Sequence, residues 1–297
     1  MRKRVLITGS LGFTGRYVAT ELEAHGWEVW GIGQQAAPET SRYFCVDLLD
    51  LGGLTAAIKS AQPNVVIHLA ANAFVGHGSP ADFYTVNVIG TRNLLEAITK
   101  SGVEPAHVVI ASSANVYGNS IGGRLAESTP PNPENDYAVS KFAMEKMAQL
   151  WRQRLPITLV RPFNYTGVGQ SEDFLVPKIV RHFLDRAPRI ELGNLDVFRD
   201  FSDVRDVAKI YRLIAEQHTE LRVLNICSGN TVALGEILEI ATNTSGHELE
   251  VAVNPAFVRA NEVKTLCGDA TLLEAAIGSF ARTRFDDTLG WMLAETP

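Results

Sequence analysis

The sequence predicts an α/β protein with a doubly wound parallel sheet flanked by helices. Short β-branched runs alternate with segments of helical periodicity through the first half of the chain, which is typical of consecutive βαβ units. Several runs, such as Val65–Leu69 and His107–Ser112, are apolar without alternation, so both faces of these strands are expected to be buried. Strands of this kind need helices on both sides of the sheet.

Each expected strand is a short apolar run, and each expected helix is a longer segment between two such runs. The expected strands are Arg4–Thr8, Glu28–Ile32, Tyr43–Val46, Val65–Leu69, His107–Ser112 and Ile157–Arg161. The expected helices are Gly15–His25, Leu51–Ala61, Asp82–Ser101 and Asp136–Arg154. Beyond Arg161 the pattern loosens into shorter elements, among which we expect a strand at Val223–Cys227 and a helix at Leu234–Ser245.

Composition excludes several classes of protein. The chain has 297 residues, of which 46% are hydrophobic and 20% charged, as in a globular protein with a large core. A net charge of -6 argues against a nucleic-acid surface, and no apolar run approaches the roughly 20 residues of a membrane span. The start has no signal-peptide core, so a cytoplasmic location is expected. Cys45, Cys227 and Cys267 lack metal-ligand spacing, which suits reduced thiols and predicts no metal site.

Three glycines follow the first expected strand and open the first expected helix. Gly9, Gly12 and Gly15 are spaced Gly-x-x-Gly-x-x-Gly, and glycine lets backbone N–H groups approach a pyrophosphate at a helix N-terminus. A tight turn without a ligand is the alternative, which the strand–turn–helix setting disfavours. The turn therefore predicts a dinucleotide cofactor and a sheet of the Rossmann type.

The end of the second expected strand bears on the choice of cofactor. A site for NAD carries an acidic residue about 20 residues after the glycine turn, but this chain has Gly33 followed by glutamines. Nothing there repels a 2′-phosphate, and Arg16 or Arg42 could pair with it, although a solvated helix face is an equal reading for Arg16. NADPH is therefore favoured, with NADH left open.

Tyr137 and Lys141 lie four residues apart on an expected helix. This spacing puts two side chains on one face, with Cβ atoms about 6 Å apart, so the ammonium is expected to lower the pKa of the phenol from about 10. The pair would then serve as a proton donor and acceptor near neutral pH. An exposed helix pair without function is the alternative.

Further motifs occur in order along the chain. They are Asp47-Leu48, His68-Leu-Ala-Ala71, Ala111-Ser-Ser-Ala-Asn-Val-Tyr-Gly118, Asn132-Pro-Glu-Asn-Asp-Tyr137 and Arg161-Pro-Phe-Asn164. With the glycine turn and Lys141, they resemble the extended short-chain dehydrogenase/reductase family that acts on nucleotide sugars, over nearly the whole chain.

The resemblance implies roles for individual residues. Tyr137 would be the general acid or base, Lys141 would hold the nicotinamide ribose, and Ser113 would hydrogen-bond the reacting oxygen, although Ser113 could be a strand-end cap and Asp47 a turn residue. The implied cofactor contacts are Gly9, Gly12, Phe13, Thr14, Gly15, Arg16, Asp47, Leu48, Leu69, Ala70, Ala71, Tyr137, Lys141 and Phe163.

Position 115 discriminates between reactions within the family. The resemblance implies a Glu there in 4,6-dehydratases and a Cys in the fucose-forming epimerase/reductases, whereas this chain has Asn115, which exchanges no proton near pH 7. Two reactions of the family are then left open, which are the reduction of a ketone and the oxidation–reduction cycle of a 4-epimerase. Residues 163–170, 195–206, 225–229 and 254–262 resemble bacterial reductases of GDP-6-deoxy-4-keto-D-mannose, which form GDP-D-rhamnose, so reduction is favoured.

The same resemblance implies how a GDP-linked sugar would bind. Arg199 and Arg259 would hold the diphosphate, Glu262 the ribose hydroxyls, and Asn164 a phosphate, with Ser113 at the reacting carbon. A 4-epimerase, a reductase of another nucleotide-linked keto sugar and a non-catalytic NADP(H) sensor remain as alternatives.

The domain organisation follows from these assignments. We expect a dinucleotide-binding domain at residues 1–163 and about 202–232, and a substrate-binding domain at about 164–201 and 233–297. A homodimer is expected through the helices Asp82–Ser101 and Asp136–Arg154, although core packing alone could explain their apolar residues.

Overall fold

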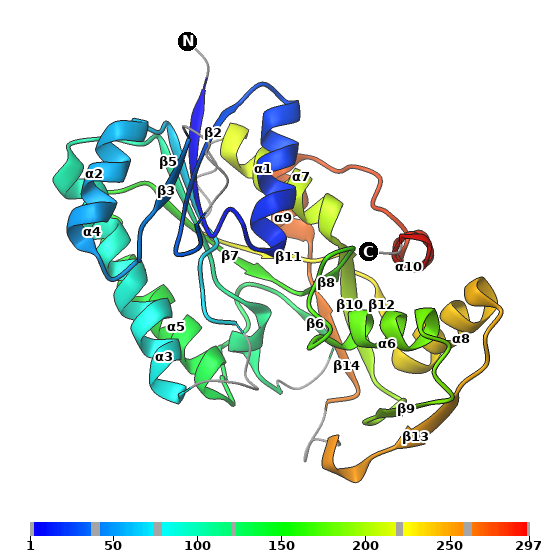
Figure 1. Cartoon of the computed structure of the whole chain (residues 1–297). Helices are drawn as coiled ribbons and strands as arrows, with labels where there is room; N and C mark the ends of the chain where they lie inside the picture. The colour runs from blue at the N-terminus through cyan, green and yellow to red at the C-terminus, as the bar shows by residue number, and fades with distance from the viewer. Residues whose placement is uncertain are drawn as a thin grey trace.

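The computed structural model describes residues 3–36, 42–73, 79–119, 123–217, 222–257 and 263–295. Its main feature is a parallel sheet with the strand order β11-β7-β5-β4-β1-β2-β3, in which every neighbouring pair is parallel (Figure 1). These strands are β1 (Arg4–Thr8), β2 (Glu28–Gly33), β3 (Tyr43–Cys45), β4 (Val65–His68), β5 (His107–Ala111), β7 (Ile157–Pro162) and β11 (Val223–Ile226).

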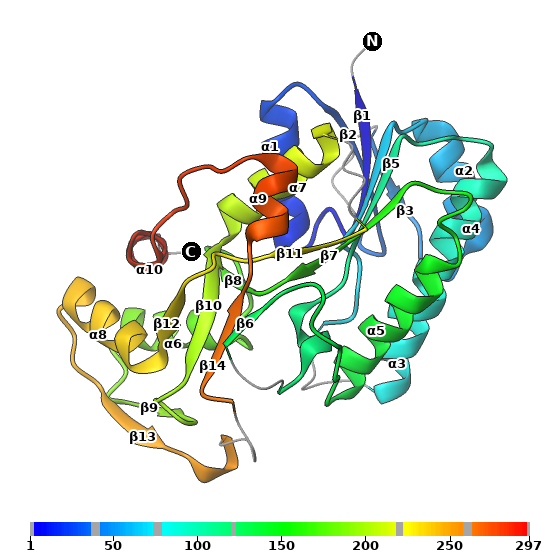
Figure 2. The same cartoon turned by 180° about the vertical axis from the view of Figure 1, so that it is seen from behind.

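Helices cover both faces of this sheet. They are α1 (Phe13–Ala24), α2 (Leu51–Ala61), α3 (Pro80–Tyr84), the π-helix η1 (Thr85–Gly90), α4 (Thr91–Ser101), α5 (Asp136–Gln149), α7 (Val204–Gln217) and α9 (Thr271–Ile277), with the 3₁₀ turn η2 (Ala114–Tyr117) after β5. α1 and α7 lie against one face, and α2, α4 and α5 against the other (Figures 1 and 2). The doubly wound α/β fold expected from the sequence is confirmed.

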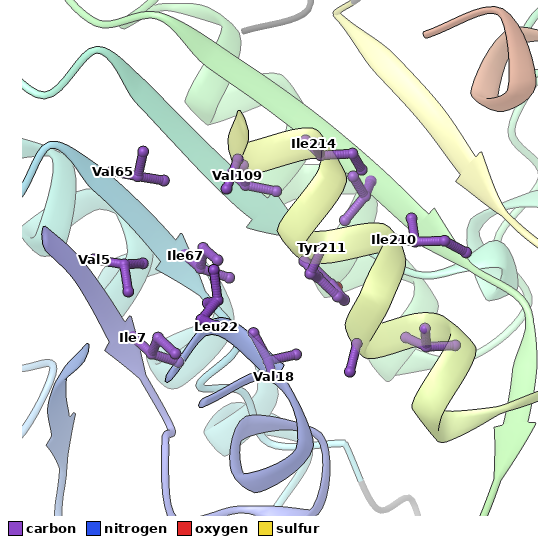
Figure 3. Packing of buried hydrophobic residues seen from close by; sticks show 14 of the residues in the cluster. Val5, Ile7, Val18, Leu22, Val65, Ile67, Val109, Ile210, Tyr211 and Ile214 are labelled. Carbon is purple, nitrogen blue, oxygen red and sulfur yellow. The ribbon is translucent and has the colours of Figure 1, made fainter. Parts of the chain in front are cut away.

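Two apolar layers fill the space between the helices and the sheet. On one face Val5 and Ile7 of β1 pack with Leu22 of α1 and Tyr211 of α7 (Figure 3). On the other face the side chains of Leu6 and its neighbours pack against α2, α4 and α5. Successive residues of β1 point to opposite faces, which is why its apolar run does not alternate with polar residues.

A second sheet forms the smaller part of the molecule, below the main sheet in Figure 1. Its strands are β6 (Gly123–Leu125), β8 (Asn164–Thr166), β10 (Phe198–Asp203), β12 (Thr231–Ala233) and β14 (Thr265–Gly268), with β9 (Arg189–Leu192) and β13 (Glu250–Val253) paired apart from them. The helices of this part are α6 (Leu175–Leu184), α8 (Leu234–Ser245) and α10 (Phe285–Ala294), with the 3₁₀ turn η3 (Pro255–Phe257). Within the described ranges no helix is long and apolar enough to cross a lipid bilayer.

Most of the expected elements are confirmed, with two differences. The expected helix Asp82–Ser101 is α3, η1 and α4 in succession, because a π-turn at Thr85–Gly90 interrupts the α-helical spacing. The expected helix Asp136–Arg154 ends at Gln149 and continues as turns up to Pro156, which cannot extend a helix. The domain boundaries remain a prediction, and β6 joins the second sheet from within the first expected segment.

The carboxylate of Asp200 on β10 connects the two sheets. It is fully buried and accepts hydrogen bonds from the N–H groups of Ser228 at 2.9 Å, Gly229 at 3.0 Å and Gly268 at 3.1 Å. The Ser228 hydroxyl donates to it as well, at 2.7 Å. Ser228 follows β11 of the main sheet and Gly268 ends β14 of the second, so one side chain fixes both strand ends.

Candidate active site

The glycine turn connects β1 to α1. Gly9 has a φ of +71°, and its N–H donates to the carbonyl of Ile32 at 2.7 Å. A Cβ at Gly15 would collide with the Gly9 carbonyl oxygen, so this position accepts only glycine. Gly12 caps α1 without a side-chain hydrogen bond, which leaves N–H groups of the first helical turn for a ligand. The turn has the form that receives a pyrophosphate.

His68 bridges the end of β4 to its neighbours. The Thr91 hydroxyl donates to the Asn87 carbonyl at 2.6 Å, so it accepts from Nε2 of His68 at 2.8 Å. Nδ1 then accepts from the Thr8 hydroxyl at 2.6 Å, and Thr8 accepts from the N–H of Ala70 at 3.2 Å. Burial, and secondarily the nearby lysine ammonium, lowers the pKa of His68 to about 3. A neutral imidazole therefore fixes the start of the expected cofactor loop.

Asn87 in η1 holds the next part of that loop. Its Oδ1 accepts from the N–H of Asn72 at 2.9 Å, and its Nδ2 donates to the Asn72 carbonyl at 3.1 Å and to the Ser140 hydroxyl at 2.9 Å. Ser140 in turn donates to the carbonyl of Tyr137 at 2.7 Å. One amide thus connects the cofactor loop to α5. Asn87 was not among the site residues expected from the sequence, where it is a polar side chain among the apolar residues of the expected helix Asp82–Ser101.

Tyr137 and Lys141 lie on α5, next to the end of β5. Their side chains are 9% and 5% exposed, so the reading of an exposed helix pair is wrong. The Lys141 ammonium donates to the carbonyl of Ala111 at 2.7 Å, and Tyr137 hydrogen-bonds the side chain of Ser113. Ser113 Oγ also accepts from the N–H of Asn115 at 3.1 Å, so it caps η2 as well. The structure brings the three expected catalytic residues together.

The expected effect of Lys141 on the phenol is wrong in this structure. Burial raises the pKa of Tyr137 to about 12, against a lowering by the Ser113 hydrogen bond and a further raising by Tyr165. Burial also lowers the pKa of Lys141 to about 8. Helical spacing put the two residues on the same helix, but it could not predict that burial would raise the pKa of the phenol.

Arg161 and Glu145 form a buried ion pair next to the catalytic residues. Arg161 on β7 donates from Nε and Nη2 to both carboxylate oxygens of Glu145 on α5, at 2.8 and 2.7 Å. Nη1 of Arg161 donates to the Tyr117 hydroxyl at 3.0 Å, and Tyr117 donates to Asn225 Oδ1 at 2.7 Å. Glu145 lies one helical turn beyond Lys141, so this chain of contacts locks α5 against the sheet. This ion pair was not among the contacts expected from the sequence.

The other expected cofactor residues lie along the same edge of the sheet. Asp47 accepts from the N–H of Leu49 at 2.7 Å and from Gln34 at 2.8 Å, which is the behaviour of a turn residue. Leu48 is buried, and a Cβ at Gly90 would come within 2.9 Å of it. Leu69, Ala70 and Ala71 follow β4, Phe13 and Thr14 begin α1, and Phe163 is buried after β7. Their roles as cofactor contacts remain proposals.

The expected substrate residues are only partly described. Asn164 is exposed and donates to the carbonyl of Asp200 at 3.1 Å. Nη1 of Arg199 donates to the carbonyls of Phe198 at 2.9 Å and Val263 at 3.0 Å, so this arginine supports the backbone beside the segment 258–262. Arg259 and Glu262 belong to that segment, which lies outside the described residues.

Tyr165 on β8 is a site residue that our sequence analysis did not identify. Its hydroxyl hydrogen-bonds the Thr14 hydroxyl at 2.7 Å, and its ring stacks on Phe13 with centroids 6.2 Å apart. This contact joins the glycine turn to the second sheet. A glycine turn that opens a helix, a buried tyrosine with a neighbouring lysine, and a serine at the next strand end define an NAD(P)-dependent oxidoreductase site on a dinucleotide-binding fold.

Comparison with known proteins agrees with this class. Residues 6–292 match the family described as GDP-mannose 4,6 dehydratase. A GDP-6-deoxy-D-talose 4-dehydrogenase from Aggregatibacter actinomycetemcomitans is 37% identical over 93% of this chain and 92% of its own. A GDP-6-deoxy-D-mannose reductase from Pseudomonas aeruginosa is 32% identical over 98% of this chain and 92% of its own.

Solved structures give the same result. A Burkholderia cenocepacia J2315 protein, whose assignment as an epimerase is itself provisional, has a TM-score of 0.93 and 47% identity, covering 98% of this chain and 97% of its own. RMD from Pseudomonas aeruginosa complexed with NADPH has a TM-score of 0.85 and 29% identity, covering 98% of each chain.

The chain belongs to the GDP-mannose 4,6-dehydratase-like family of extended short-chain dehydrogenase/reductases. It is an NAD(P)-dependent oxidoreductase of the class that carries out redox chemistry at C4 of nucleotide sugars.

Proposed function

We propose that the protein reduces the C4 ketone of GDP-6-deoxy-4-keto-D-mannose to GDP-D-rhamnose with NADPH. The observation that carries this proposal is the grouping of Ser113, Tyr137 and Lys141 at the end of β5, where Tyr137 hydrogen-bonds Ser113 and Lys141 donates to the carbonyl of Ala111. Reduction of a ketone needs a proton donor for the developing alkoxide, and a phenol hydrogen-bonded to a neighbouring hydroxyl can supply it.

Position 115 supports reduction over dehydration. Asn115 is exposed two residues after Ser113, at the position where the family resemblance implies a glutamate in the dehydratases. An amide has no proton to exchange at neutral pH, so it cannot assist elimination of water. The cysteine that the resemblance implies at this position in the fucose-forming enzymes is also missing, because residue 115 is an asparagine.

Each side chain around the ketone would have a separate role. The Ser113 hydroxyl donates a hydrogen bond to the C4 oxygen, and Tyr137 delivers the proton to the same oxygen as negative charge develops. Lys141 orients the nicotinamide ribose, and Gly9, Gly12 and Gly15 leave room for the pyrophosphate. When bound, the reduced cofactor supplies the hydride to C4. The nucleotide of the sugar would lie over the second sheet.

The dehydrogenase relative raises a specific alternative. 6-Deoxy-D-talose and 6-deoxy-D-mannose differ in configuration at C4, so their nucleotide sugars share one 4-keto form. An enzyme of this class could therefore form either product, depending on the face of the ketone that receives the hydride. A 4-epimerase would use both faces in turn, which requires the phenol to lose its proton in the first half of the cycle.

The test is incubation of the purified protein with GDP-6-deoxy-4-keto-D-mannose and NADPH. Consumption of NADPH is expected, and the NMR spectrum of the product should show GDP-D-rhamnose. Tyr137→Phe keeps the ring and removes the proton, so turnover should fall by roughly 10² to 10⁴ while the cofactor still binds. Conversion of GDP-D-rhamnose to its C4 epimer without added cofactor, or unchanged turnover by Tyr137→Phe, would contradict the proposal.

A homodimer remains part of the proposal. The helices expected to form the contact carry exposed apolar residues, with Ile89 of η1 48% exposed and Val139 of α5 37% exposed. Replacing both by charged residues should convert a dimer to a monomer in sedimentation experiments. An unchanged sedimentation coefficient would place any dimer contact elsewhere.

A further inference from the structure

Four aromatic side chains form a continuous row across the boundary between the two sheets. This aromatic row consists of Tyr165 on β8, Phe13 and Tyr17 on α1, and Trp291 on α10. The centroids of successive rings are 6.2, 5.6 and 6.2 Å apart, with the first pair stacked and the other two pairs edge to face. Such pairs stabilise a contact beyond the apolar area that they bury. α1 belongs to the main sheet, but its N-terminal end points toward the second sheet (Figure 1), where it contacts both β8 and α10.

Two hydrogen bonds attach the row to the start of α1. The Tyr165 hydroxyl bonds the Thr14 hydroxyl at 2.7 Å, and the Tyr17 hydroxyl donates to the carbonyl of Val168 at 2.8 Å. Val168 lies in the turn that follows β8. Gly12 caps α1 without a side-chain hydrogen bond, so the contacts from Tyr165 and Val168 help to orient this end of the helix. It is the end that faces the expected pyrophosphate.

The other end of the aromatic row returns to the second sheet. The guanidinium carbon of Arg205 lies 3.9 Å from the centroid of the Trp291 ring. Arg205 donates from Nε and Nη2 to the two carboxylate oxygens of Asp203, at 2.9 and 2.6 Å, and the Thr288 hydroxyl of α10 donates to the same carboxylate at 2.7 Å. Asp203 ends β10, where it pairs with Thr166 of β8. The contacts therefore run from β8 through α1 and α10 to β10, and α1 cannot shift without straining them.

The two strands at the ends of this path carry residues expected to bind the nucleotide sugar. β8 begins with Asn164, which donates to the carbonyl of Asp200 on β10 at 3.1 Å. β10 carries Arg199, which supports the carbonyl of Val263 at 3.0 Å, beside the segment 258–262. A coenzyme that fixes the first turn of α1 therefore also restricts the strands on which the second ligand would lie. The second ligand then loses less conformational entropy when it binds.

We propose that the aromatic row couples the two sites, so that the coenzyme and the nucleotide sugar each tighten the binding of the other. Tyr165 and Tyr17 are positioning residues in this coupling, because they act through α1 and β8. The factor of tightening is the same in both directions, since the two ligands share one coupling free energy. The nucleotide sugar in this inference rests on the proposed function, whereas the effect of the coenzyme on the second sheet does not.

Hydrogen exchange with the coenzyme alone tests the coupling without any sugar. In the native protein NADPH should slow amide exchange by about fivefold or more in residues 164–170 and in α10, as well as in the glycine turn. Tyr165→Phe combined with Tyr17→Phe keeps all four rings but removes both hydroxyl groups. The slowing should then be confined to the part built on the main sheet. Exchange in α10 of the native protein that does not respond to NADPH would overturn the proposal.

Tyr84→Phe is the matched control for this double variant. It also removes a tyrosine hydroxyl from a hydrogen bond, to Asp136 at 2.9 Å, but both partners of this bond belong to the part built on the main sheet. The control should show the same spread of slowed exchange as the native protein. A control that behaves like the double variant would show that the row has no special role.

Calorimetry with two ligands measures the coupling itself. NADP⁺ should tighten the binding of GDP to the native protein by about fivefold or more, and GDP should tighten the binding of NADP⁺ by the same factor. In the double variant each ligand alone should bind within about threefold of its native affinity, while the mutual tightening falls below about twofold. A merely structural role would weaken both single ligands and leave the tightening unchanged, and that result would refute the coupling. If melting temperatures show that the double variant fails to fold, Tyr165→Phe alone repeats the measurement.

These measurements separate the inference from the proposed function. If NADPH slows exchange in α10 only while both hydroxyl groups are present, but GDP does not bind, the coupling stands and the GDP-linked substrate fails. If the keto sugar is reduced while the slowed exchange stays within the part built on the main sheet, the reductase stands and the coupling fails.

Discussion

The buried ammonium of Lys141 makes the stability of this protein depend on pH in a predictable direction. Burial lowers its pKa from 10.5 to about 8, so between these values the unfolded chain binds a proton that the folded chain does not. Stability therefore rises with pH over this window and is lowest below pH 8. Since one pKa unit corresponds to about 1.4 kcal/mol, Lys141 opposes folding at pH 7 by about 3 kcal/mol.

Lys141→Met isolates this contribution. Methionine has a similar length but no charge, so the variant loses the pH-dependent cost together with the hydrogen bond to Ala111. The lost hydrogen bond shifts stability by the same amount at every pH, whereas the proton effect does not. Between pH 7 and 9.5 the free energy of unfolding of the native protein should rise by about 2 kcal/mol relative to that of the variant.

The assay is urea unfolding of cofactor-free protein at several pH values in this range. Lys146→Met is the matched control, because Lys146 is exposed on the same helix and should give a curve parallel to that of the native protein. A Lys141→Met curve parallel to the native one within about 0.5 kcal/mol would show that the ammonium is not desolvated, and the reasoning would fail. The variant should also lose reductase activity.

Three other changes test the structure. Arg161→Met should cost about 3 to 5 kcal/mol in urea unfolding by leaving Glu145 buried and unpaired, and adding Glu145→Leu should recover part of this loss; equal losses would contradict the argument. Asn87→Ala should lower stability by about 1 to 3 kcal/mol and weaken NADPH binding, because it leaves the backbone of the cofactor loop unpaired; unchanged calorimetric binding would dismiss this role. Gly15→Ala should weaken NADPH binding by about tenfold or more, since its Cβ collides with the Gly9 carbonyl, and normal binding would refute the turn as a pyrophosphate site.

The sequence predicted the elements whose signals are local. The apolar runs gave the strands of the main sheet, and the glycine spacing gave the start of α1. The short strands of the second sheet were not predicted, because β6, β8 and β12 have three residues each and no clear period. The pairing of Arg161 with Glu145 could not be predicted either, because it depends on how α5 packs on β7.

In the candidate site, too, the sequence predicted the features with local signals and not those that depend on long-range contacts. Motif spacing identified Ser113, Tyr137 and Lys141, and the structure brings them together. The direction in which the pKa of Tyr137 shifts depends on burial, which spacing does not report. Tyr165 was missed because its importance comes from contact with Thr14, which is far away in the sequence.

The position of Asp200 has a consequence for how the molecule comes apart. Because the carboxylate of Asp200 on β10 binds N–H groups at strand ends of both sheets, separating the two sheets would leave this buried carboxylate without part of its hydrogen bonds. Melting should then occur as one event, and a nucleotide seated on the main sheet should protect the second sheet from proteases as well. The part of the molecule built on the second sheet is therefore not expected to fold when it is expressed alone.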